Sequence, residues 1–167
     1  MQATRTSSLQ AGDIRTYLYA MLFVAGNIIL PQLCHLMPQG GLVWLPIYFF
    51  TLTGAYAFGW RTGLIVAVAS PLVNSALFAM PPAAALPVIL MKSVLLALFA
   101  AFAARKAGRV RLLAVATAVI ASQAVGSLGE WAITGSAATA LQDVRIGLPG
   151  ILLQIFGGTA LLRALLR

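Results

Sequence analysis

The residues best suited to chemistry in this sequence are a few charged and amide side chains set within long apolar runs. Lys92 and Glu130 each lie inside such a run, and Asn74 and Gln154 lie inside two others. A charged side chain near the middle of a membrane helix costs about 2.5–3.5 kcal/mol to insert and indicates a functional site by default. Such side chains suit the recognition of a small molecule through ion pairs and hydrogen bonds.

Lys92 is the strongest candidate for a functional residue, because no carboxylate lies three or four residues from it along the chain. Its partner is therefore either Glu130 or an anionic ligand, and both contacts can coexist. At about 1.5 Å per helical residue, Lys92 lies about 13–15 Å below the outer boundary of the membrane and Glu130 about 5 Å below it. A lysine stem that extends outward could partly close this gap. Glu130 could instead be solvated.

Four further residues complete the candidate binding site. Asp143 and Arg145 flank the last outer loop, where they could cap the sixth helix, close the site or simply be solvated. Asn74 could bond a carbonyl freed by Pro71 or contact a ligand. Gln154 lies near the midplane. The predicted substrate-binding residues are Lys92, Glu130, Asn74, Gln154, Arg145 and Asp143.

The sequence gives no sign of catalysis or of a cofactor. Cys34 and His35 have no further ligand at a suitable spacing, so we expect no metal site. A phosphate-binding glycine loop, a Ser/His/Asp set and a paired carboxylate site are all missing from the sequence. The sequence therefore predicts a protein that is not an enzyme and that has no ATPase of its own.

The elements that hold these residues are membrane helices. Of 167 residues, 61% are hydrophobic and only 8% are charged, against about 45–50% and about a quarter in soluble domains. Breaks in the apolar runs predict one membrane domain over 1–167, an all-α compact bundle of six transmembrane helices. The predicted spans are 16–36, 42–58, 64–79, 83–104, 112–133 and 146–166.

Basic residues predict the orientation of the bundle. The net charge is +8, and nine of the Lys and Arg residues fall at the chain ends or in the loops after the second and fourth spans. With six spans these places share one side, which the positive-inside rule makes cytoplasmic, so both termini are predicted to be cytoplasmic. The strongly polar residues of the spans then lie in the outer half or near the midplane, which favours a cavity open to the outside over a continuous pore.

Two other patterns leave alternatives open. Small residues recur every four positions on the fifth span, from Ala114 to Gly126, and on the fourth span at Ala97 and Ala101. Such stripes permit close helix approach, either inside the bundle or against another membrane subunit. Prolines within the spans would kink helices or end them early.

Several stretches between Arg15 and Ala104 resemble one known family. They are Gly26-Asn-Ile-Ile-Leu-Pro31, Met37-Pro-Gln-Gly-Gly-Leu-Val-Trp-Leu-Pro46, Gly59-Trp-Arg-Thr-Gly63 and Ser70-Pro-Leu-Val-Asn74 to Met80-Pro-Pro82. In these stretches the chain resembles the substrate-binding (S) components of energy-coupling-factor (ECF) vitamin transporters. The last two spans match mainly in length and polarity.

The resemblance implies a bundle that binds a vitamin or related micronutrient at its outer face, in a bacterial or archaeal cell membrane. It implies docking on a coupling transmembrane subunit driven by two cytoplasmic ATPase subunits. Many family members dock through small residues on the first helix. This chain has Ala20, Ala25 and Gly26 there, and the pair Gly63 and Ala67 is a second candidate.

Two other functions fit the same sequence. A self-sufficient small transporter or channel would need no partner subunits, and a membrane scaffold would bind no small molecule. The lysine near the midplane favours a ligand with a carboxylate or other anionic group.

Overall fold

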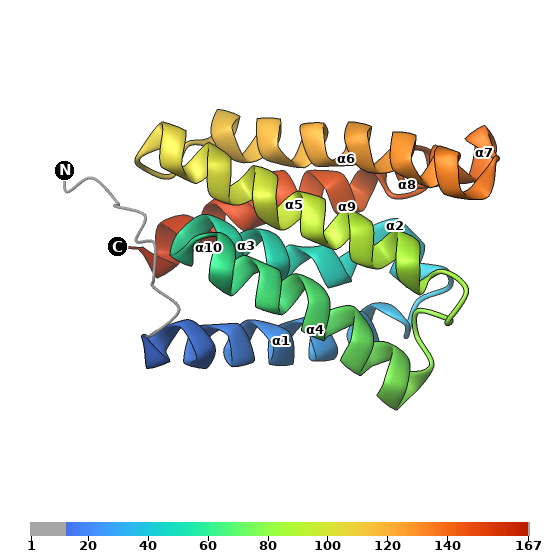
Figure 1. The fold of residues 1–167 in the computed structure, drawn as a ribbon, viewed down its shortest axis with the longest axis horizontal. Helices are drawn as coiled ribbons and strands as arrows, with labels where there is room; N and C mark the ends of the chain where they lie inside the picture. The colour runs from blue at the N-terminus through green and yellow to red at the C-terminus, as the bar shows by residue number, and fades with distance from the viewer. Residues whose placement is uncertain (1–12, 167) are drawn as a thin grey trace.

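The computed structural model describes residues 13–166 and has six helical segments long and apolar enough to cross a membrane. Four are continuous or nearly so, and two are divided. In chain order the elements are α1 (Ile14–Cys34), α2 (Gly40–Trp44), η1 (Pro46–Tyr48), α3 (Phe49–Phe58), α4 (Trp60–Phe78), α5 (Leu86–Ala107), α6 (Leu112–Thr134), α7 (Ala137–Ala140), α8 (Gln142–Arg145), α9 (Leu148–Leu152), η2 (Leu153–Gly157) and α10 (Gly158–Leu165). The predicted six-helix membrane bundle is confirmed (Figure 1).

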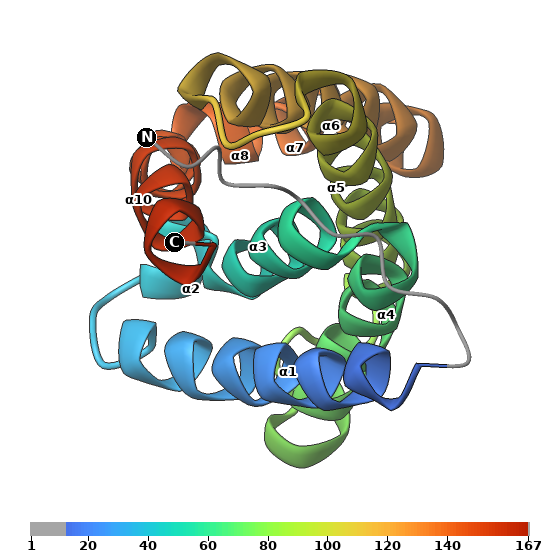
Figure 2. The same cartoon turned by 90° about the vertical axis from the view of Figure 1, so that its left-hand side faces the viewer.

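Helix α3 lies in the middle of the bundle. Figure 2 shows α1, α4, α5 and α10 around it, with α6 packed on α5. Every residue from Thr51 to Phe58 is buried. Because lipid tails are as apolar as this helix, its burial reflects close packing with neighbouring helices and not removal from water. Helix α3 supplies the core against which the other spans pack.

The second span differs from its predicted form as one helix over 42–58. Leu45 has φ +46° and ψ +47°, which ends α2 and turns the chain into η1. A residue before proline is disfavoured in the right-handed helical region, so Pro46 promotes this break. Gly150 of α9 approaches the same backbone so closely that a Cβ atom would collide with the carbonyl of Trp44.

Four prolines lie in α-helices, and they fall into two groups. Pro87 and Pro149 stand in the first turns of α5 and α9, where the missing N–H costs no helical bond. Pro31 and Pro71 lie inside α1 and α4. Each leaves the carbonyl four residues earlier without its helical partner, and for Pro31 that carbonyl belongs to Asn27.

Small residues bring the helices together within the bundle. A Cβ atom at Gly63 of α4 would collide with Ala55 of α3, and it would lie 3.3 Å from the Cβ of Ala97 on α5. Ala67 is fully buried as well, so Gly63 and Ala67 pack inside the bundle and form no exposed docking face. On α1, Ala20 is also buried, whereas Ala25 is exposed.

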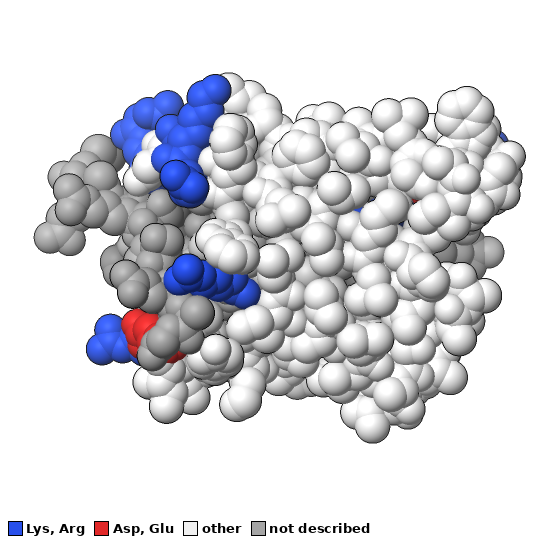
Figure 3. All heavy atoms as spheres, in the orientation of Figure 1, with Lys and Arg blue, Asp and Glu red and all other residues white. Residues whose placement is uncertain are grey.

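The two ends of the bundle differ in charge. Helix α1 begins and α10 ends at the same end (Figure 1), and basic side chains gather there (Figure 3). Arg145 lies between α7 and α9, beyond the opposite end of α6. Arg5 and Arg167, which also supported the predicted orientation, lie outside the described residues. The positive-inside rule predicts that the basic end is the cytoplasmic one.

Candidate functional site

The ammonium group of Lys92, on α5, contacts two carboxylates from separate elements. Its Nζ lies 2.5 Å from Oε2 of Glu130 on α6. It also donates a hydrogen bond of 2.7 Å to Oδ2 of Asp143 on α8. Only 5% of the Lys92 side chain is exposed, and 12% and 15% of the two acidic side chains. We call these three residues the Lys92 cluster; they make the ion pairs found within residues 13–166.

Close packing of α5 against α6 holds the Lys92 stem in place. A Cβ atom at Gly126 would lie 2.9 Å from Cγ of Lys92, so only glycine leaves room for the stem at this crossing. Glu130 lies one turn further along the same face of α6. The stem runs along Gly126, and its ammonium group therefore reaches the Glu130 carboxylate. Of the two partners that the sequence allowed for Lys92, Glu130 or an anionic ligand, the structure shows Glu130.

Asp143 joins the cluster from the last outer loop. The sequence predicted a polar loop after the fifth span, with Asp143 capping a helix, closing the site or solvated. The structure has two short helices there, α7 and α8, and Asp143 lies in the first turn of α8. Because Asp143 contacts Lys92, the segment that contains α7 and α8 lies against the cluster. Arg145, two residues on, is exposed and lies away from the cluster, beside Thr139 and Gln142.

A small polar cavity adjoins the cluster. It has a volume of about 10 Å³, close to the least space that holds one water molecule. Its lining residues are Tyr48, Lys92, Leu96, Ser122, Gln123 and Gln154. Gln154 is 1% exposed, and its Nε2 has no hydrogen-bond partner. A buried amide that lacks a partner costs free energy, so this donor is available to a bound molecule.

The backbone at Gln154 is itself irregular. Residues Leu153–Gly157 form a π-helical turn, η2, between α9 and α10. Such turns are rare and occur frequently at functional sites, because the extra residue redirects one side chain. The sixth predicted span, 146–166, is therefore divided at the point where Gln154 meets the cavity.

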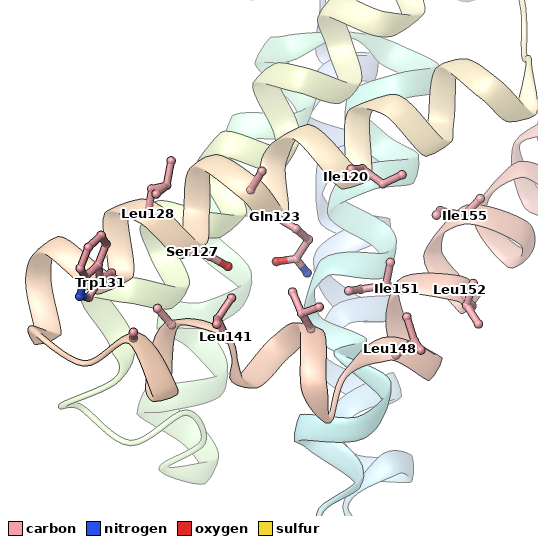
Figure 4. A pocket seen from close by; sticks show the side chains of 14 residues that line it. Ile120, Gln123, Ser127, Leu128, Trp131, Leu141, Leu148, Ile151, Leu152 and Ile155 are labelled. Carbon is pink, nitrogen blue, oxygen red and sulfur yellow. The ribbon is translucent and has the colours of Figure 1, made fainter.

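A much larger groove runs beside this cavity, between α6 and the segment from α7 to η2 (Figure 4). Its volume is about 780 Å³, within the range of sites for small organic ligands. Apolar residues form most of its wall: Ile120, Leu128, Trp131, Leu141, Val144, Leu148, Ile151, Leu152 and Ile155. Gln123 lines both the groove and the small cavity, and Figure 4 shows its amide directed from α6 toward α9.

Asn74 belongs to a different polar network, which joins α1, α3 and α4. Its Nδ2 donates to the carbonyl oxygens of Asn27 and Ser70, both at 2.9 Å. The Asn27 carbonyl is the one freed by Pro31, so Asn74 compensates for Pro31. The sequence had suggested that Asn74 compensates for Pro71. Neither bond reaches the Lys92 cluster.

Asn27 ties the same network together. Its Nδ2 donates to Thr51 Oγ1 and to Ser70 Oγ, and its Oδ1 accepts from the backbone N–H of Phe50, each at 3.1 Å. The Phe50 N–H stands in the first turn of α3, where a helix has no internal acceptor for it. Asn27 therefore caps α3 from a neighbouring helix, which is a structural role.

Four of the six predicted binding residues thus meet at one place: Lys92, Glu130, Asp143 and Gln154. Asn74 and Arg145 lie elsewhere. The prediction of an anionic ligand rested on a lysine short of carboxylates, and the structure gives Lys92 two. The predicted set lacked Tyr48, Ser122 and Gln123 of the cavity wall; among these, Ser122 stands on the same stripe as Gly126 and Glu130, which was a usable signal.

Within residues 13–166, no group of three His, Cys, Asp or Glu side chains could hold a metal ion. A comparison of the chain with protein-family models, with curated proteins and with solved structures finds no match.

Proposed function

We propose that this chain is the substrate-binding subunit of an ECF-type importer that captures a vitamin or related micronutrient at the outer face of the membrane. One observation carries the proposal: the Lys92 cluster lies beside the unpaired amide of Gln154, in a bundle whose other described charged side chains are not buried. Buried charges in a membrane bundle are costly, and binding a ligand is a reason to retain them. The sequence resemblance set out above supports the same function.

The position of the cluster favours a binding subunit over a channel. It lies in the half of the bundle away from the basic end, where α7 and α8 close over it. In the central helix α3, the hydroxyls of Thr51 and Thr53 bond to carbonyls of their own or the adjoining turn. They therefore do not extend a polar path from the cluster toward the cytoplasmic end.

The proposal includes partners and a location. The chain itself would catalyse no reaction, and transport would depend on a coupling transmembrane subunit and two cytoplasmic ATPase subunits. The host membrane would be a bacterial or archaeal cell membrane, in which the basic end of the bundle faces the cytoplasm.

Two measurements test this function together. Small molecules are extracted from gently purified protein and identified by mass spectrometry, in parallel with Asp143→Asn protein. Uptake of the identified compound is then measured in cells with and without the coupling and ATPase subunits. We expect a near-stoichiometric compound that is depleted in the variant, and uptake that requires ATP and the partner subunits.

Asn74→Ala is the matched control, since it removes a buried polar side chain outside the cluster and should leave the bound compound in place. ATP-independent uptake by the purified chain in liposomes would point instead to a self-sufficient transporter. Absence of any bound compound, together with absence of uptake, would point to a scaffold.

A further inference from the structure

The charges of the Lys92 cluster do not balance. Two carboxylates face one ammonium group. The nearest other cationic residue along the chain, Arg145, is exposed and lines a separate surface hollow with Thr139 and Gln142. The remaining basic residues of the described chain gather at the opposite end of the bundle (Figure 3). The cluster therefore carries one surplus negative charge in a largely buried place, where an unpaired charge is unfavourable.

The two cavities near the cluster differ in size and polarity. The polar cavity next to Lys92 has room for about one water molecule, whereas the adjoining groove is large and apolar. Gln123 lies on the boundary of both. The groove is open between α6 and α9, two membrane-spanning segments, and its wall residues Leu128 and Leu148 are more than half exposed. A ligand body in this groove would therefore contact the hydrocarbon of the bilayer.

We infer that the site binds an amphiphilic cation, with its positive group at the Lys92 cluster and its apolar body in the groove between α6 and α9. This inference rests on the proposed binding function and names the class of substrate. The positive group supplies the charge that the two carboxylates lack. The amide of Gln123 and the free Nε2 of Gln154 can then donate hydrogen bonds to acceptor atoms near the head of the ligand.

An anion at the same place meets the opposite situation. The Lys92 ammonium group has three N–H donors, and the two carboxylates occupy two of them. An anion bound to the third donor, or in place of one carboxylate, still stands close to Glu130 and Asp143 as a like charge. A cation meets no such repulsion from the carboxylates, because it and Lys92 share the two of them. The charge count thus separates the two ligand classes.

The test uses three probes with one apolar body and different charges: 2-naphthylmethylammonium, 2-naphthylacetate and 2-naphthylmethanol. Binding is measured by calorimetry and by the change in tryptophan fluorescence, because Trp131 lines the groove. The protein is held in nanodiscs of zwitterionic phosphatidylcholine, so that the lipid surface does not attract either ion. We expect the ammonium compound to bind at least about tenfold more tightly than the other two.

Variants locate the binding. Asp143→Asn and Glu130→Gln should each weaken binding of the ammonium probe by about tenfold or more. Arg145→Gln is the matched control, since it changes an exposed charge two residues from Asp143 and should leave the affinity within about twofold. Equal affinities for the three probes, no binding of the ammonium probe, or equal affinities in wild type and Asp143→Asn would each overturn the inference. The last result would mean that a proton already neutralises the surplus charge.

This failure is distinguishable from failure of the proposed function. Partner-dependent uptake of an anionic compound would overturn the cation and leave the importer standing. The opposite result is binding of the ammonium probe that depends on Asp143, with no uptake of the extracted compound even when the partner subunits are present. It would support a cationic ligand and overturn the importer function.

Discussion

Replacing Lys92 by methionine is the most informative perturbation of this bundle, because the charge count predicts a different result for each member of the cluster. Lys92→Met leaves two carboxylates buried with no cation. At Nζ–O separations of 2.5 and 2.7 Å, each attraction is about 6 kcal/mol at an effective dielectric constant of about 20. Desolvation of the ammonium group offsets much of this gain. Removal of one partner from a buried ion pair costs about 3–5 kcal/mol net, and we expect that loss here.

Asp143→Asn should behave differently, because it leaves a neutral Lys92–Glu130 pair. We expect its free energy of unfolding to change by less than about 1 kcal/mol. The triple variant Lys92→Met, Glu130→Gln, Asp143→Asn removes every charge and should regain most of the loss, since replacing a whole buried ion group by neutral side chains is often tolerated.

The assay is equilibrium unfolding by sodium dodecyl sulfate in mixed micelles, followed by tryptophan fluorescence. Ser93→Ala is the control: Ser93 is the next residue of α5, is fully buried, and has no partner for its hydroxyl, so its loss should be neutral or slightly stabilising. Equal destabilisation by Lys92→Met and Asp143→Asn would refute the argument from charge count. So would a triple variant no more stable than Lys92→Met.

Three further predictions concern packing and the second polar network, and the same unfolding assay measures them all. Asn27→Ala removes three side-chain hydrogen bonds and should cost about 2 kcal/mol at about 0.6 kcal/mol each, with no loss of bound compound; a stability equal to wild type would show that the network is unimportant. Gly126→Ala should cost about 1–3 kcal/mol because its Cβ meets the stem of Lys92 near the backbone, whereas Gly129→Ala, one turn on, meets only a flexible methionine end and should cost less. Gly63→Ala should destabilise by at least as much as Gly126→Ala, because its Cβ meets backbone of α3; unchanged stability with lost partner binding would instead restore Gly63 to a docking face.

The helices were largely predictable because runs of about 20 apolar residues have few other stable forms in a bilayer. The residues at which the helices begin and end were less predictable. The third span was predicted to begin at 64, but α4 begins at Trp60, since Gly59 at φ +93° reverses the chain within a single residue. The break at Leu45 has a local signal in Pro46, whereas the close approach of Gly150 to the same backbone has none.

The Lys92–Glu130 pair was predictable as one of two alternatives, because a short loop makes α5 and α6 antiparallel and Glu130 continues the small-residue stripe from Ala114 to Gly126. Asp143 was not, since its position depends on how the last outer loop folds into α7 and α8. The partner of Asn74 was missed for a related reason. The freed carbonyl that it bonds lies on another helix, and sequence spacing relates only residues of the same helix.

The central position of α3 has a consequence for biosynthesis. The chain emerges from the ribosome in order, so α3 enters the membrane before α4, α5 and α10, which later surround it. Until they arrive, the face of α3 that carries Ala55 and Tyr56 contacts lipid, and only α1 is present to cap its first turn through Asn27. The second span must therefore be apolar enough to insert by itself, although it ends as the most buried of the six spans. A chain that ends after α5 still lacks α10, and α3 then stays uncovered on that side.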